Sequence, residues 1–261
     1  MKTLRQASKP VGDEPAFLHA DERRAKGKAL RDDVPRDAHA HWKAPKDRVD
    51  IVDLLQRSNE GRLDHLVPIR HGRMMESAFA FYRGTADIMA SDLASTPVSG
   101  IRVQACGDAH LCNFGGFATP ERRVIFDIND FDETLPGPWE WDIKRLAASI
   151  VVAGRQIRLA ESDAVRAARA AACSYRERMA DFAEMRSLEV WYDAIDVDRF
   201  LKEVDSEERR EMIRRRLEAA EEKNLPEYLF PKLAEHRGAA PRIKDDPPLI
   251  FHPTAEQAPG L

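Results

Sequence analysis

The segment GIRVQACGDAHLCNFGG, residues 100–116, joins a strand pattern to a loop that is rich in functional side chains. Apolar residues stand at every second position over 101–105, which predicts a short strand that ends near a glycine. The loop that follows carries an acid, a histidine and an amide: Asp108, His110 and Asn113. Gly115 and Gly116 come next and would let the main chain approach a bulky ligand closely.

A second segment, RRVIFDINDFDE at 122–133, predicts another short strand over 122–130 and carries further acids. Residues 101–142 hold three Arg and eight acids, a balance of −5. Mg²⁺ favours one or two carboxylates and keeps waters and substrate phosphates as its other ligands. If a β-hairpin brought Asp108, Asn113 and Asp127 together, they would form a magnesium site. The alternative is a solvated acidic loop whose Asp and Asn side chains only cap turns.

The remainder of the chain predicts an α+β fold that is mostly helical, with a small sheet around the two acidic segments. Ser162 and Ser206 are each expected to cap the helix that follows. From Pro226 on, the chain is rich in proline and is expected to be irregular. Helical spacing of apolar residues covers 47–59, 69–95 with a break at Arg83–Gly84, 139–159, 163–185, 196–204 and 207–224.

Composition narrows the classes of function. A net charge of −4 and a pI of about 6.1 argue against a general nucleic-acid binder. No apolar run reaches about 18 residues and no apolar segment follows Met1, so neither a membrane span nor a signal peptide is expected. The three cysteines show no paired spacing, which favours a reducing cytoplasm over a disulfide-bonded protein.

Several motifs resemble known families. GDAHLCN (107–113) resembles the G-D-x-H-x-x-N loop of aminoglycoside and choline phosphotransferases, which are protein kinase-like enzymes, although Cys106 replaces a frequent histidine. IFDIND (125–130) resembles their metal-binding segment, and GPWEWDIKRLA (137–147) resembles the helix start downstream of it. Over residues 50–250, the ordered motifs resemble more closely a bacterial family called domain of unknown function 2252. These motifs are RMMESAFAFYRG, CGDAHLCNFG and FDINDFDETLPGPWEWDIKRLAAS.

The resemblance implies a fold and a set of roles. Residues 49–250 would form the catalytic, C-terminal lobe of a protein kinase-like fold with a small β-hairpin that carries the site. Residues 1–48 would be a poorly ordered or loosely helical arm, and residues 251–261 an irregular tail. The implied roles are a catalytic base at Asp108 supported by His110, Mg²⁺ ligands at Asn113 and Asp127 with Asp130 in reserve, a loop brace at Asp142, and nucleotide contacts at Arg83 and Gly115. Arg83 also fits a structural salt bridge, and His110 a structural histidine.

The implied function is transfer of a phosphoryl group from ATP, with Mg²⁺, to a hydroxyl of a small molecule or protein. A kinase also needs a glycine-rich hairpin and a strand lysine, yet no lysine lies between Asp47 and Asp108. We therefore expect the front part of a longer, permuted enzyme, inactive alone, whose missing-lobe surface drives association. One alternative is a metal-dependent phosphoesterase or nuclease that activates water with the same acids. The other is a non-catalytic binding or scaffold fragment.

Overall fold

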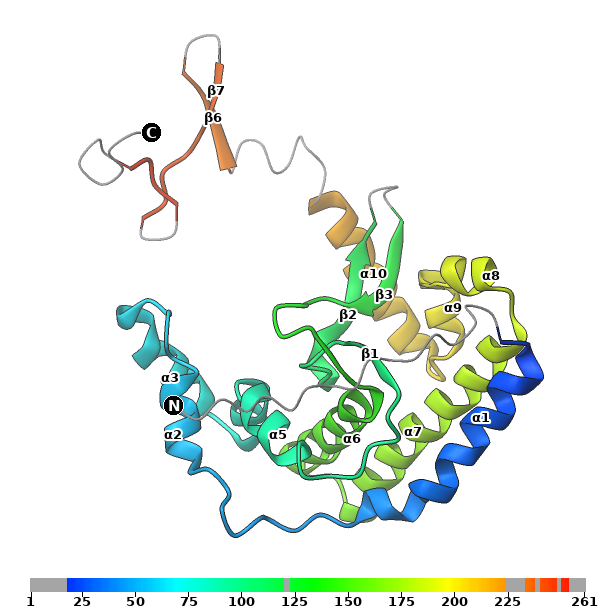
Figure 1. The fold of residues 1–261 in the computed structure, drawn as a ribbon. Helices are drawn as coiled ribbons and strands as arrows, with labels where there is room; N and C mark the ends of the chain where they lie inside the picture. Colours follow the sequence, from blue (N-terminus) through cyan, green and yellow to red (C-terminus); the bar gives the residue numbers. More distant parts are fainter. Residues whose placement is uncertain (1–17, 120–122, 224–232, 238–239, 248–249, 254–261) are drawn as a thin grey trace. The chain divides into compact units, whose positions relative to one another are not determined.

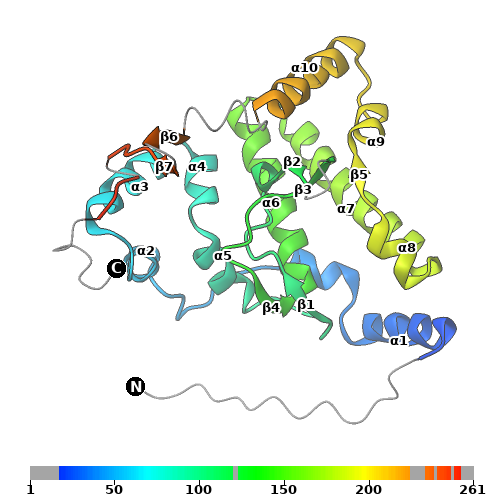
Figure 2. The same cartoon turned by 90° about the horizontal axis from the view of Figure 1, so that it is seen from above.

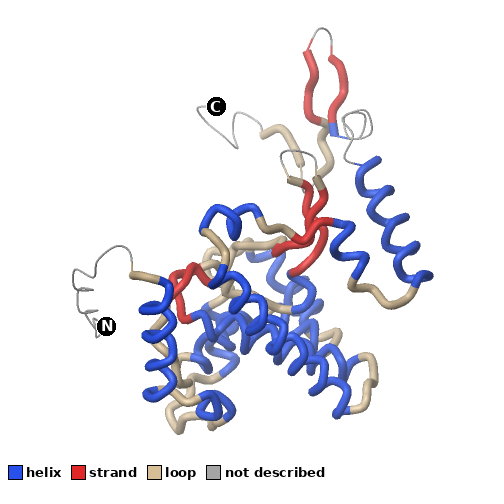
Figure 3. Tube along the Cα trace, turned by 90° about the vertical axis from the view of Figure 1, so that its right-hand side faces the viewer, coloured by secondary structure: helices blue, strands red, loops and turns tan. Residues whose placement is uncertain are grey.

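The structure, a computed structural model, describes residues 18–119, 123–223, 233–237, 240–247 and 250–253. Helices dominate, and the strands are short and pair in antiparallel fashion where their register is defined (Figure 3), which confirms the predicted α+β class. The described chain divides into two compact units. The first unit comprises described residues within 1–115 and 128–193, and the second unit those within 116–127 and 194–261. The predicted division at residues 48 and 250 stays a prediction.

The first unit is built almost entirely from helices (Figure 1). Two strands that lie entirely within it, β1 (Arg102–Ala105) and β4 (Leu135–Pro138), pair antiparallel with Ala105 opposite Leu135. Its helices are α1 (Ala20–Asp33), α2 (Ile51–Arg57), α3 (Val67–Met74), α4 (Ala78–Arg83), α5 (Ala86–Leu93), α6 (Trp139–Gln156), α7 (Glu161–Glu184) and α8 (Ser187–Tyr192), with 3-10 turns at Arg36–Ala40, Asp64–Leu66 and Leu111–Asn113.

Local capping chemistry sets several helix boundaries in the first unit. The side chain of Asp50 accepts a hydrogen bond from Val52 N at 2.7 Å and starts α2. The predicted 69–95 segment contains three helices, because Ser77 takes an extended backbone conformation and caps α4 by accepting from Ala80 N at 3.0 Å. The predicted cap at Ser162 is wrong: Ala160, which lacks a side-chain acceptor, precedes α7, and Ser162 lies inside the helix.

The longest helices, α6 and α7, pack side by side and form the centre of the first unit (Figures 1 and 2). Their close approach depends on small residues, because a Cβ added at Gly154 of α6 would lie only 2.8 Å from Ala164 Cβ. Ala164 is fully buried. The buried apolar residues of this unit are Met74, Ile88, Leu93, Ala105, Cys106, Ala109 and Ala164.

The second unit contains the sheet β2-β3-β5, made of β2 (Phe114–Ala118), β3 (Val124–Ile128) and β5 (Ile195–Asp196). Phe126 of β3 stacks on Phe200 of α9 (Val197–Lys202), with ring centroids 4.9 Å apart. Ser206 Oγ accepts from Arg209 N at 3.4 Å and starts α10 (Glu207–Lys223), which confirms the predicted cap. The expectation of irregular chain after Pro226 is wrong in part, since β6 (Ala234–Arg237) and β7 (Ala240–Ile243) form a hairpin.

The strand that precedes Asp108 and the strand that carries Asp127 belong to different sheets. β1 pairs with β4, whereas β3 pairs within the sheet β2-β3-β5. A hairpin made of these two strands is therefore not formed, but β3 lies next to β2, the strand that directly follows Asn113, and Asn129 N donates to Asn113 O at 2.9 Å. β4 lacked a strand signal because it contains two prolines, Pro136 and Pro138, which cannot donate ladder hydrogen bonds.

The packing of α6 on α7 predicts opposite effects for two glycine substitutions. Gly154→Ala should lower the free energy of unfolding by about 1–3 kcal/mol, because the new methyl group would overlap Ala164. Gly72→Ala is the matched control in α3, where a Cβ would meet nothing within 4 Å, and it should raise stability by about 0.5–1 kcal/mol. Urea denaturation measures both values, and a stabilising Gly154→Ala would contradict the packing.

Candidate functional site

One face of α6 holds the main chain of the loop that carries Asp108. Asp142, in the first turn of α6, accepts hydrogen bonds from Cys106 N at 2.8 Å and Gly107 N at 3.0 Å. Two turns further along the helix, the fully buried Ser149 Oγ accepts from Leu111 N at 2.9 Å. These are the hydrogen bonds that the resemblance implies for Asp142, while its role as the brace of a catalytic loop stays a prediction.

Gly107 meets a backbone requirement of the same loop. Its φ of +80° lies in the left-handed region, and a Cβ there would stand 2.0 Å from Glu133 O. No other residue type fits this position without moving the chain before β4. The loop is thus fixed both by α6 and by the segment that leads into β4.

Asp108 is held by a buried arginine that the sequence analysis did not single out. Arg145 Nε donates to Asp108 Oδ1 at 2.7 Å, and Arg145 Nη2 donates to the same oxygen. The Arg145 side chain is only 2% exposed, against 15% for the Asp108 side chain. Arg145 Nη2 also donates to Tyr82 O at 2.9 Å, and the guanidinium lies 4.6 Å from the centre of the Tyr82 ring. The Asp108 carboxylate therefore has a fixed direction and a partly exposed edge.

His110 lies buried beside Asp108. Its Nδ1 accepts from Cys112 N at 3.1 Å, so in the neutral ring the proton is on Nε2, which stands 3.5 Å from Asp108 Oδ2. Burial lowers the pKa of His110; Asp108 opposes this effect, and the charges of Arg145 and Arg83 add to it. A neutral His110 therefore directs its Nε2–H toward the second oxygen of Asp108, at a distance beyond a normal hydrogen bond.

Asn113 ties the two acidic segments together through their main chains. Its Oδ1 accepts from Asp130 N at 2.9 Å, and its Nδ2 donates to the carbonyl oxygens of Asp108 and Asp130, each at 3.0 Å. The side chain is buried, and all of these partners belong to the first unit. The amide acts here as a structural link, and its binding of Mg²⁺ stays a prediction.

The other predicted residues are distributed as follows. Asp127 is exposed on β3 and belongs to the second unit, whereas Asp108, His110, Asn113 and Asp130 belong to the first. Arg83 ends α4 and is exposed, and its charge reaches His110. A Cβ at Gly115 would lie 2.5 Å from Asn129 Nδ2, so the close approach seen at this glycine is to a side chain of the loop after β3.

The acids of the first unit create an excess of negative charge beside the loop. Partial burial raises the pKa of Glu133, and the carboxylates of Asp108, Asp130 and Asp132 raise it further. Arg62 opposes this effect only weakly, as the last of the causes. Within the described ranges, no group of three or more His, Cys, Asp or Glu side chains is arranged to hold a metal ion. A cation here would need ligands from a bound substrate or water as well.

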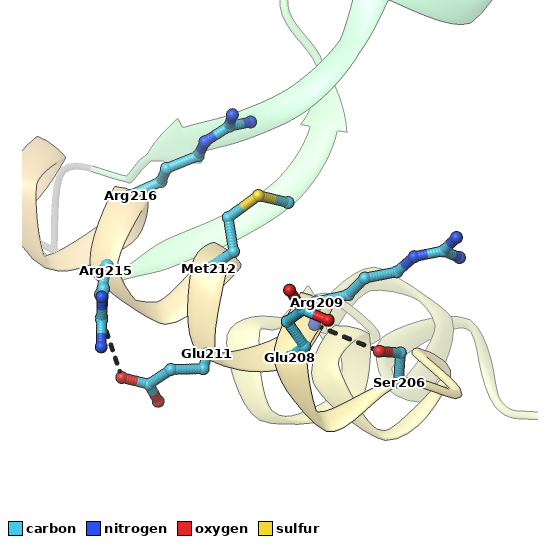
Figure 4. A pocket seen from close by; sticks show the side chains of 7 residues that line it. All are labelled: Ser206, Glu208, Arg209, Glu211, Met212, Arg215 and Arg216. Atoms are coloured by element: carbon cyan, nitrogen blue, oxygen red, sulfur yellow. Dashed lines mark hydrogen bonds and ion pairs between the residues drawn. The ribbon is translucent and has the colours of Figure 1, made fainter.

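A more open hollow lies elsewhere, along α10 in the second unit, with a volume of about 840 Å³. Arg209, Met212 and Arg216 project from one side of the helix, while Arg215 turns to Glu211 at 3.1 Å (Figure 4). The hollow contains none of the predicted site residues.

Comparison with known proteins gives one match. Residues 62–259 match the model of a family described as an uncharacterized protein conserved in bacteria, DUF2252. The chain belongs to this family, as the ordered motifs predicted. No curated protein and no solved structure matches it. Among the helices that the structure describes, none is both long and apolar enough to cross a lipid bilayer.

The environment of His110 predicts a pH dependence of stability. Because the folded protein lowers the pKa of this histidine below its ordinary 6.5, the unfolded chain binds a proton first as the pH falls. The free energy of unfolding should therefore decrease from pH 7 towards pH 5. His110→Asn should weaken this decrease, since Asn still offers an acceptor to Cys112 N but does not titrate. His65→Asn is the control, because His65 is exposed. If urea denaturation gave the same dependence of the free energy of unfolding on pH for both variants, the assignment to His110 would be wrong.

Proposed function

We propose that the Asp108 loop performs Mg²⁺-dependent transfer of a phosphoryl group from ATP to a hydroxyl, in the manner of protein kinase-like enzymes. One observation carries the proposal: the partly exposed Asp108 carboxylate has its direction fixed by the buried Arg145 on a loop that α6 braces. Catalysis of phosphoryl transfer consists mostly of positioning and of charge stabilisation, so a pre-set carboxylate is the feature that it needs.

Asp108 would orient the acceptor hydroxyl and accept its proton. Its Oδ1 is engaged by Arg145, whereas Oδ2 faces His110 at 3.5 Å, beyond a normal hydrogen bond. A substrate hydroxyl approaching Oδ2 would meet a carboxylate whose orientation costs no further ordering. General-base assistance of this kind contributes about 10²–10⁴-fold to a rate.

The residues present fit a bound cation on electrostatic grounds. Partial burial raises the pKa of Glu133, and the carboxylates of Asp108, Asp130 and Asp132 raise it further, so a cation bound beside them would be favoured. Mg²⁺ needs only one or two carboxylates when nucleotide phosphates supply the remaining ligands. The proposed ligands are those that the resemblance implies, Asn113 and Asp127 with Asp130 in reserve, and Arg83 and Gly115 are the proposed phosphate contacts. When bound, Mg²⁺ would neutralise charge on the transferred group.

A non-catalytic binding or scaffold role is the second candidate. It is favoured by Asn113, because this buried amide is fully engaged in linking the main chains of Asp108 and Asp130. Such a link suits a rigid scaffold as well as a catalytic loop. The hydrolase alternative has less support, since His110, the one histidine beside these acids, accepts from Cys112 N through Nδ1.

Substitution of the acids separates their proposed roles. Asp108→Asn should lower phosphoryl transfer by about 10²-fold or more and leave Mg²⁺–ATP binding intact. Asp127→Asn should abolish transfer and also weaken Mg²⁺–ATP binding, with a smaller effect from Asp130→Asn. Formation of phosphorylated products from a panel of alcohols measures transfer. Calorimetric titration with Mg²⁺–ATP measures nucleotide binding.

Asp163→Asn on α7 is the control, because its carboxylate pairs with Arg166 on the helix surface, away from the Asp108 loop. Thermal melting must accompany Asp108→Asn, since that change leaves the buried Arg145 without its carboxylate. Equal loss of nucleotide affinity in Asp108→Asn and Asp127→Asn would contradict the division of roles. Absence of Mg²⁺–ATP binding in longer members of the same family as well would favour the scaffold, since the present chain is itself expected to be inactive alone.

A further inference from the structure

Residues 18–48 form an N-terminal arm within the first unit, ahead of residues 62–259 that match the family model. None of these arm residues is buried, in α1, in the 3-10 turn Arg36–Ala40 or in the segments between them. Arg24 of α1 contacts Glu184 of α7, but both side chains are more than half exposed, so this ion pair contributes little. Segments with few buried contacts open locally at a small cost in free energy. The attachment of the arm therefore depends on its other polar contacts.

The C-terminal end of the arm is anchored to α5 by a paired arginine. Arg48 donates to both carboxylate oxygens of Asp92, from Nε at 2.6 Å and from Nη2 at 2.7 Å. Trp42 Nε1 donates to Asp92 O at 3.3 Å, and the Arg48 guanidinium lies 5.9 Å from the centre of the Trp42 ring. The anchor thus consists of an arginine, an aspartate and an indole, none of which ordinarily changes charge between about pH 5 and 8.

His39 attaches the middle of the arm to the segment before β1 through one ring nitrogen. Its ring contacts the main chain of Pro97, and because proline has no N–H, the ring must donate to the carbonyl oxygen. Nδ1 is buried and has no hydrogen-bond partner among the described residues, so Nε2 is the donor and Nδ1 carries no proton in the neutral ring. Arg36 and Asp37, the charged residues of the same turn, are exposed. A proton on Nδ1 would be a buried donor without an acceptor.

Two charged groups face His39, and both lie on α6. Lys144 Nζ donates to the same Pro97 O at 3.3 Å, so its ammonium group and the His39 ring share one acceptor. Glu140 Oε1 accepts from Ser99 N at 2.7 Å, while its buried Oε2 has no partner among the described residues. Burial lowers the pKa of His39 below its ordinary 6.5 and the charge of Lys144 lowers it further, while Glu140 and the contact with Pro97 oppose these effects. The docked arm therefore favours a neutral His39.

We propose that His39 is a pH-sensitive latch, which holds residues 18–41 against the first unit while its ring is neutral and releases them when the ring takes up a proton. Protonation would place a second positive charge beside Lys144 and give the ring a buried N–H without an acceptor. In the released arm, both ring nitrogens would regain water. The pair of Arg48 with Asp92 would keep the arm attached, so the release is a local opening. The inference does not depend on phosphoryl transfer, because none of these residues belongs to the candidate site.

Amide hydrogen exchange in the full chain, corrected for the effect of pH on the intrinsic exchange rate, measures the release. If only the released arm binds the proton, with the ordinary pKa of 6.5, the equilibrium constant for opening should rise about tenfold between pH 7.5 and pH 5.5. The protection of the amides of α1 should therefore fall about tenfold. Amides in the centres of α6 and α7 should remain far better protected at both pH values, because they exchange only when the first unit unfolds.

His39→Gln keeps an amide donor near the position of Nε2 but does not titrate, so α1 should then be protected equally at both pH values. His41→Gln is the matched control, because His41 lies two residues further on and is exposed, and it should keep the tenfold fall. The same fall in His39→Gln as in the unaltered protein, or no protection of α1 at pH 7.5, would overturn the proposal. It would also be overturned by a gain of protection at pH 5.5, which would mean that protonated His39 pairs with Glu140 Oε2.

Discussion

The pairing of the buried Arg145 with Asp108 is the constraint on which the candidate site depends. Removing a guanidinium from water costs several kcal/mol unless charge and hydrogen bonds compensate for the lost hydration. The compensation comes from the Asp108 carboxylate, from Tyr82 O and from the face of the Tyr82 ring. The end of α4, the loop after β1 and the middle of α6 must therefore meet around one side chain. Tyr82 OH also donates a hydrogen bond to Arg145 O at 2.8 Å, which links α4 directly to α6.

α6 organises the loop by the regular spacing of its side chains. Asp142, Arg145 and Ser149 follow one another at intervals of three and four residues, so they lie on one face of the helix. Each holds a later part of the loop: first the amides at 106–107, then the carboxylate of Asp108, and finally the amide of Leu111. The loop therefore lies along the helix and contacts it at three successive points. This arrangement explains how an irregular segment keeps a polar, partly buried carboxylate in a fixed place.

Much of this architecture was accessible from the sequence, but the decisive contact was not. Alternation over 101–105 and the motif around Asp142 correctly indicated a strand, a loop and a bracing helix. β4 was missed because its two prolines suppress the strand signal, and the pairing of β1 with it follows from tertiary structure. Arg145 was missed because arginine is rarely fully buried, and only the fold brings its partners to it. The position of Asp127 beside the other acids rests on spacing alone.

A double-mutant cycle on Asp108 and Arg145 tests the central claim most directly. Asp108→Asn, Arg145→Met and the combined variant would be compared by urea denaturation at pH 7. Each single change should destabilise the protein strongly, because one partner of a buried pair is left behind. We predict that the combined change costs about 1–3 kcal/mol less than the sum of the two single changes. Additivity within about 0.5 kcal/mol would show that the two side chains act independently, and would contradict the proposed anchoring of the loop.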